Sequence, residues 1–135
     1  MNDLGTGVRT FESGANRDVA EGKPDYEGYI RPEVLVEFGA YMERHQHLAD
    51  GSVRASDNWQ QGFGAPGDWK GHCAVCMKSL LRHAIDLWLF HRGGEGRDSV
   101  EDALGGLLFN TMAFWYGLIR EREAGYPRPD EEGAL

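Results

Sequence analysis

Residues 98–122 read DSVEDALGGLLFNTMAFWYGLIRER, and this stretch decides the fold. Asp98 or Ser99 can cap the start of a helix, and Glu101 and Asp102 in the first turn suit the positive end of the helix dipole. Apolar residues then recur at helical spacing on two faces. One face holds Val100, Leu104, Leu107, Leu108, Thr111, Trp115 and Leu118, and the other holds Gly105, Gly106, Phe109 and Ala113. A helix that is apolar on two sides packs on more than one neighbour, so we expect a central helix that continues to about Arg122.

Two more helices are predicted before this one. Pro32 suits a first turn, and apolar residues from Val34 to Met42 follow at helical spacing, so the first helix should run to about His47. The second should run from about His72 to His91. Its apolar stripe consists of Met77, Leu80, Leu81, Ala84, Ile85 and Trp88. Residues 48–71 between the two helices have turn chemistry throughout, and connections of that length are often functional.

The predicted fold class is therefore all-α, because no run of β-branched residues with a period of two is present. We expect a small antiparallel helical bundle with an extended N-terminal arm. The arm would cover residues 1–30, the bundle 31–124 and a disordered acidic tail 125–135. Three helices make a thin core, so we expect a homodimer or higher homo-oligomer to complete it.

Composition limits the partners. Acids outnumber bases 22 to 14, which gives a formal net charge of −8. This argues against binding to a nucleic acid polymer, which needs a basic face. No segment reaches the ~20 apolar residues that cross a bilayer, and the N-terminus lacks the basic start and apolar run of a secretory signal. We therefore expect no membrane partner and a cytoplasmic location.

The sequence His72-Cys73-Ala74-Val75-Cys76 contains a CxxC motif. Two such cysteines can bind zinc or act as a redox pair. However, no second CxxC or HxxxH supplies further ligands, and a βαβ context is absent. The simplest interpretation is two small residues on a helix, and the zinc and redox interpretations stay open beside it.

Polar side chains on the helices form a second candidate site. Carboxylates that project inward from adjacent helices can bind Mg²⁺ or Mn²⁺, and the metal can then bridge phosphate oxygens. The last helix offers Asp98, Glu101 and Asp102, and the first offers Glu37 and Glu43. Lys78 and Arg82 could clamp the remaining phosphate oxygens. For any single acid the alternative is a solvated surface charge.

The long connection supplies a third candidate at residues 56–62, SDNWQQG. Trp59 could stack on a nucleobase and Asn58 could hydrogen-bond to its edge, although an aromatic plug for the core is the alternative for Trp59. Asn110, inside an apolar run, is either a satisfied core amide or a base reader.

These residues follow the order of signatures in a phage protein family, the N-terminal domains of dATP/dGTP diphosphohydrolases, which the chain resembles over roughly residues 13–115. The matching segments are Ser13 to Asp18, Gly22-Lys23 with Tyr26, Pro32 to Glu43, Asn58-Trp59 with Gly62, Arg82-His83, Glu101-Asp102, and Asn110. The family is similar in kind to MazG-like all-α nucleotide pyrophosphohydrolases, which bind Mg²⁺ through ExxE and ExxD patterns. The nearest patterns here are His83-xx-Asp86 and Asp98-xx-Glu101.

The resemblance implies metal-dependent hydrolysis of a purine deoxynucleoside triphosphate to its monophosphate and pyrophosphate, with Mg²⁺ or Mn²⁺ as cofactor. The implied metal ligands are Glu37, Asp98, Glu101 and Asp102, and the implied catalytic residues are Glu43, His83 and Asp102. The implied phosphate-binding residues are Lys23, Lys78 and Arg82, and the implied base-binding residues are Asn58, Trp59 and Asn110. Two alternatives remain: a phage protein that sequesters a nucleotide without turnover, and an acidic helical interaction protein.

Overall fold

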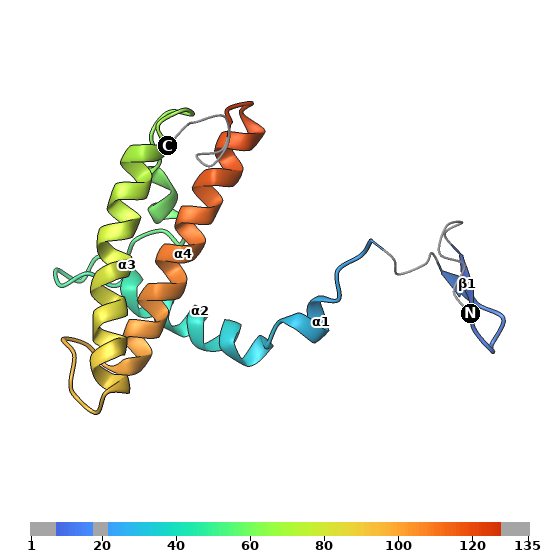
Figure 1. Ribbon diagram of the computed structural model, residues 1–135, viewed down its shortest axis with the longest axis horizontal. Coiled ribbons are helices and arrows are strands. Elements are labelled where there is room, and N and C mark those ends of the chain that lie inside the picture. The colour runs from blue at the N-terminus through green and yellow to red at the C-terminus, as the bar shows by residue number, and fades with distance from the viewer. Residues whose placement is uncertain (1–7, 18–21, 128–135) are drawn as a thin grey trace. The chain divides into compact units, whose positions relative to one another are not determined.

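The structure is a computed structural model that describes residues 8–17 and 22–127. Helices dominate the described residues, which confirms the all-α fold class (Figure 1). In chain order the elements are β1 (Arg9–Thr10), β2 (Asn16–Arg17), α1 (Tyr26–Tyr29), α2 (Pro32–Gln46), the 3₁₀ helix η1 (Asn58–Gly62), α3 (Trp69–His91) and α4 (Val100–Glu123). None of the described helices is long and apolar enough to cross a membrane.

The chain divides into two compact units, residues 1–35 and 36–135. In the first unit β1 pairs with β2 in antiparallel register, with Arg9 opposite Arg17. Gly14, at φ 87°, occupies the turn between them. The side chain of Asp25 caps α1. The sequence predicted only an extended arm over residues 1–30, because ladders of two residues are too short to produce a readable period.

The second unit is built on the hairpin of α3 and α4, which lie side by side along their lengths (Figure 1). Of the two predicted caps, Asp98 and Ser99, it is Ser99 that caps α4, by accepting a hydrogen bond from the Asp102 N–H at 3.1 Å. Helix α2 ends at Gln46 and α3 ends at His91, both close to the expected positions, whereas α3 begins at Trp69, ahead of the expected His72. The predicted disordered tail falls mainly on residues 128–135, which lie outside the described residues.

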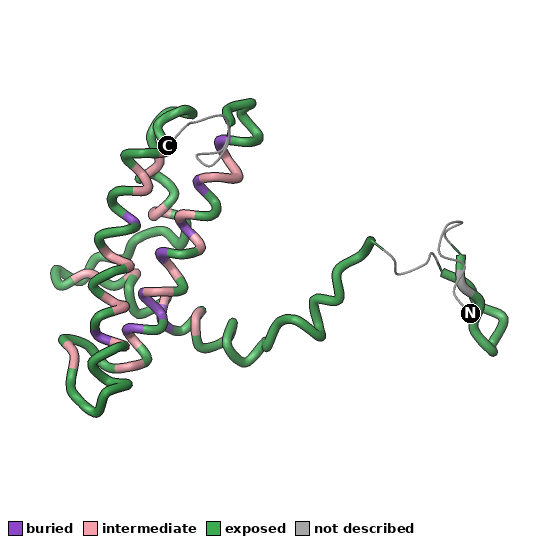
Figure 2. The backbone as a smooth tube through the Cα atoms, in the orientation of Figure 1, coloured by how far each residue is buried: buried purple, intermediate pink, exposed green. Residues whose placement is uncertain are grey.

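The predicted small-residue face of α4 is its buried face (Figure 2). Its buried residues are Ala103, Gly105, Gly106, Asn110, Ala113, Gly117 and Glu121. A Cβ atom on Gly105 would overlap the ring of Tyr41 on α2, and one on Gly106 would overlap the ring of His83 on α3. The glycines therefore let rings from two neighbouring helices pack directly against the α4 backbone.

The larger apolar stripes face this core only in part, contrary to the prediction: Leu80, Ala84, Val100, Leu107 and Leu118 are half-buried, and the remaining members are exposed. On α3, Leu81, Ile85 and Trp88 are 53%, 54% and 64% exposed, and on α4 Leu104, Leu108 and Trp115 are also exposed. The buried residues of α3 are Cys76 and Asp86. Because α4 offers small residues and hydrogen-bond acceptors, α3 turns its more polar side toward α4, and its most apolar side faces outward.

Candidate functional site

A pocket of about 310 Å³ lies within the second unit. Four segments line it: the end of α2, the loop that precedes η1 together with η1 itself, the middle of α3 and the middle of α4. The lining residues are Tyr41, Met42, His45, Gln46, Arg54, Ala55, Ser56, Asn58, Trp59, Ser79, His83, Phe109 and Asn110. The structure thus brings together the three residues predicted to bind a base, Asn58, Trp59 and Asn110, and one residue predicted to be catalytic, His83.

Aromatic rings form one wall of the pocket. Trp59 meets Phe109 edge-on at a centroid distance of 5.6 Å, and it also contacts Phe63 and Tyr116 at 5.7 and 5.9 Å. These contacts fix η1 on α4 and give Trp59 the role of an aromatic plug. The same half-buried ring also lines the pocket, so the plug contributes to the wall against which a planar ligand would lie.

Asn110 is the most buried polar group of the pocket, with 6% of its surface exposed. Its Nδ2 donates one hydrogen bond to the Gly106 carbonyl at 2.8 Å and another to Ser79 Oγ at 3.1 Å. The amide therefore links α4 to α3. These bonds account for its nitrogen, and among the described residues none donates a hydrogen bond to its side-chain oxygen, Oδ1.

A tight turn carries Arg54 to the pocket. The Arg54 N–H donates to the Gln46 carbonyl at 2.8 Å, and Gln46 Nε2 donates back to the Arg54 carbonyl at 3.2 Å. The Asp50 carboxylate closes the turn by accepting from Ser52, and these hydrogen bonds lower the pKa of Asp50. In the part of the chain that the structure describes, no carboxylate pairs with the exposed guanidinium of Arg54.

His83 connects the pocket to a group of possible metal ligands. One ring nitrogen of His83 and one oxygen each of Asp86 and Asp98 lie within 4.8 Å of one another. The Nδ1 atom of His83 is buried without a hydrogen-bond partner. Within residues 8–17 and 22–127, no other three histidine, cysteine or acidic side chains converge in this way.

Asp86 is 3% exposed and is held by Arg97. One carboxylate oxygen accepts from Arg97 Nη2 at 2.8 Å, and the other accepts from the Arg97 backbone N–H at 3.0 Å. Hydrogen bonding to Arg97 lowers the pKa of Asp86, and the nearby His83 adds to the effect. This pair fixes the loop between α3 and α4 and keeps Asp86 as a carboxylate.

The other predicted acids are dispersed. Asp102 forms an ion pair with Arg44 of α2 at 3.1 Å, which joins α2 to α4. Glu37, Glu43 and Glu101 are exposed and belong neither to the pocket lining nor to the group around His83. Of the four acids expected to bind metal, only Asp98 has a carboxylate oxygen within 4.8 Å of other possible ligand atoms, those of His83 and Asp86.

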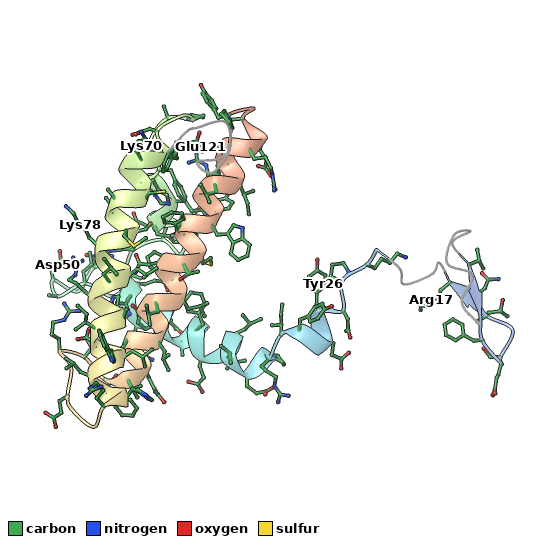
Figure 3. All side chains as sticks on the ribbon, viewed as in Figure 1. Arg17, Tyr26, Asp50, Lys70, Lys78 and Glu121 are labelled. Carbon is green, nitrogen blue, oxygen red and sulfur yellow. The ribbon has the colours of Figure 1, made fainter. Side chains whose placement is uncertain are left out.

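The predicted phosphate-binding residues also lie outside the pocket lining. Lys78 and Arg82 are exposed on α3, and Lys78 projects from the outer side of that helix (Figure 3). Lys23 belongs to the first unit, residues 1–35. Arg54, the arginine that does line the pocket, was not singled out from sequence. Its signal was weak, because it is one arginine in a loop rich in turn residues.

The cysteine motif lies at the opposite end of α3 from Asp86. The ring of His72 packs against the backbone of Gly117, and its Nε2 donates to the Ala113 carbonyl at 2.8 Å. Burial raises the pKa of the Cys73 thiol to about 11, with smaller contributions from Cys76 and Glu121. Both cysteines are free, and burial also raises the pKa of Cys76. The interpretation as small packing residues accounts for these observations.

No protein family matches the chain, and neither a curated protein nor a solved structure shows significant similarity to it. The functional argument therefore depends on the pocket and on the residues that line it.

Proposed function

We propose that the pocket binds a purine nucleotide, with the base against Trp59 and Phe109 and the phosphates toward Arg54. The convergence of Asn58, Trp59, His83 and Asn110 on one pocket carries this proposal. Aromatic walls with a few convergent polar groups are typical of small-molecule sites. The volume of about 310 Å³ suits a base and sugar, with the phosphates outside.

Arg54 supports the anionic part of this ligand. The chain carries a net charge of −8, so its overall field repels anions and a local cation is needed to hold a phosphate. An arginine without a carboxylate partner retains its whole fork of donors for phosphate oxygens.

Both cysteines are free thiols, which suits a reducing compartment such as the cytoplasm, and we propose that location for the protein.

Nucleotide binding can be tested by thermal unfolding of the full chain with dATP, dGTP, dCTP and dTTP, each with and without EDTA. A ligand at a hundred times its Kd should stabilise the fold by about 2.7 kcal/mol. We expect a purine nucleotide to raise Tm more than a pyrimidine nucleotide. If none of the four changes Tm at millimolar concentration, the proposed function is wrong.

Hydrolysis of the nucleoside triphosphate to monophosphate and pyrophosphate is the second candidate, and the group of His83, Asp86 and Asp98 favours it. One ring nitrogen of His83 and one oxygen each of Asp86 and Asp98 lie within 4.8 Å of one another and would supply three ligands to a divalent cation, with the Asp86 oxygens also accepting from Arg97. One imidazole and two carboxylates suit Mn²⁺ better than Mg²⁺, which prefers oxygen ligands. A bound cation would offset charge on the phosphate oxygens.

Pyrophosphate release with Mn²⁺ and then Mg²⁺ tests the second candidate. We expect turnover to be lost in Asp98→Ala and retained in Glu101→Ala, a matched change on an exposed acid of α4 that lies outside the group. Nucleotide binding that survives EDTA without any turnover would instead favour sequestration.

We also propose that a second copy of the chain covers the outer face of α3. The stripe of Leu81, Ile85 and Trp88 is exposed, and no large side chain among the described residues is fully buried. Two identical uncharged stripes are self-complementary in a symmetric helix pair, which buries the same residues on both copies. Homo-oligomerisation would thus supply the apolar core that α3 and α4 lack.

A further inference from the structure

Asn110 is held so that only one of its two polar atoms remains for a ligand. Its Nδ2 carries two hydrogens, and both have acceptors: the Gly106 carbonyl at 2.8 Å and Ser79 Oγ at 3.1 Å. An amide nitrogen has no further donor to offer. The remaining polar atom, Oδ1, has no hydrogen bond within the described chain.

The orientation of this amide follows from its partners. A backbone carbonyl can only accept, so the atom of Asn110 that faces the Gly106 carbonyl must be the nitrogen. Reversing the amide would place two oxygens 2.8 Å apart and lose the bond. Oδ1 therefore points away from the α4 backbone in any low-energy arrangement.

Oδ1 is also accessible from the pocket. Among the described residues, the one buried side-chain oxygen or nitrogen without a partner is Nδ1 of His83, so Oδ1 of Asn110 keeps some exposed surface. Only 6% of the residue is exposed, and Asn110 lines the pocket. The exposed part of this side chain thus opens into the pocket.

We infer that Asn110 is a specificity-determining residue that selects a ligand with an N–H donor, such as the exocyclic amino group of adenine or guanine. The inference rests on the proposed nucleotide function and refines it. A ring without a donor at this position would bury Oδ1 without a partner, and an unpaired buried acceptor is costly. A fixed acceptor can discriminate in this way because it cannot rotate to present a donor instead.

Calorimetric titration of the full chain tests the inference with three probes: dATP, dGTP and the triphosphate of purine 2′-deoxyriboside. The last probe lacks both the exocyclic amino groups and a ring N–H. We expect the tighter of dATP and dGTP to bind at least about fivefold more strongly than the bare purine. In Asn110→Leu this ratio should fall to near one, whereas Thr111→Val, a change on an exposed neighbour, should preserve it.

Ser79→Ala provides a second variant that keeps the amide but removes one acceptor of its nitrogen. We expect the ratio to be largely retained in this variant, because the Gly106 carbonyl still accepts from Nδ2 and keeps Oδ1 as the atom left for a ligand. Equal binding of the bare purine and both amino-purines by the wild-type chain would overturn the inference and leave the proposed function intact. If none of the three probes binds, both are wrong.

Discussion

The imidazole ring of His83 lies directly against Gly106, so that α3 and α4 approach each other at the level of the pocket. The ring occupies the space that any side chain at position 106 would need. Glycine costs about 1 kcal/mol relative to alanine inside a helix. The glycine at position 106 is explained by the packing of His83 against the α4 backbone, and the glycine at position 105 by the packing of Tyr41.

Gly106→Ala should destabilise the fold, because the new methyl group must displace the His83 ring. Overpacking typically costs about 1–3 kcal/mol and the gain in helix propensity is about 1 kcal/mol, so we expect a net loss of up to about 2 kcal/mol. Chemical denaturation measures the difference. Gly39→Ala is the matched control, since Gly39 lies within α2 and its Cβ would meet nothing within 4 Å. That variant should be neutral or slightly stabilised, and equal effects at both positions would contradict the packing argument.

Much of the helical architecture was predictable from local chemistry. The Ser99 cap and the small-residue face of α4 were read correctly, because capping and periodicity act over a few residues. Which face of α3 points inward was not predictable from hydrophobicity. His72, Ser79 and His83 face α4 because it offers carbonyl groups, an amide and glycines, and that complementarity exists only between two helices.

The residues of the candidate site were also predicted only in part, because residue type can be read from the sequence and convergence in space cannot. Asn58, Trp59 and Asn110 were predicted to bind a base and His83 to act in catalysis, and the fold brings all four to one pocket. The basic residues that line the pocket were harder to predict, because exposed charges such as Lys78 and Arg82 occur on every helix surface. Arg54 reaches the pocket only through the hydrogen bonds between Gln46 and the turn that follows it.

Acid should weaken the fold through Asp86. The pKa of this carboxyl is lower in the folded chain because it accepts hydrogen bonds from Arg97. Its stabilising contribution is therefore complete above the unfolded pKa of about 3.9 and is lost as the pH falls through the folded value. Thermal unfolding from pH 7 down to pH 2 should show a fall in Tm below about pH 4 that is smaller in Asp86→Asn.

Asp86→Asn should also have a lower Tm than the wild type at pH 7, because the charge of Arg97 loses its partner. Glu95→Gln provides the control, since Glu95 is an exposed acid in the loop between α3 and α4 that also contains Arg97. An unchanged acid profile in Asp86→Asn would show that other carboxylates govern the acid response.

Cys73 should react slowly with alkylating reagents at neutral pH. The reactive species is the thiolate, and a thiol pKa of about 11 leaves far less thiolate than the pKa of 9.0 of an unperturbed thiol. Iodoacetamide should modify Cys73 of the folded chain roughly a hundredfold more slowly than in urea, as followed by peptide mass spectrometry. The rate should rise steadily toward pH 11. Rapid modification at pH 7 would instead point to a redox-active pair.

Arg54→Ala should weaken nucleotide binding about 10- to 100-fold, as expected for loss of one or two charge-assisted hydrogen bonds. Arg82→Ala is the matched control, because Arg82 is an exposed arginine of α3 that does not line the pocket. Calorimetric titration with the tightest-binding nucleotide measures the Kd of each variant. A larger loss in Arg82→Ala than in Arg54→Ala would return phosphate binding to the outer face of α3.

The outer face of α3 should determine the oligomeric state. Light scattering after size-exclusion chromatography should give at least twice the chain mass for the wild type, because a second copy removes Leu81 and Ile85 from water. A glutamate at either position would place a charge in that apolar contact, so Leu81→Glu and Ile85→Glu should be monomeric and soluble. Gln60→Glu adds the same charge at an exposed position of η1 and should not change the mass. A monomeric wild-type chain would mean that the stripe meets a different partner or none, and α3 would then have to tolerate its exposed apolar side in water.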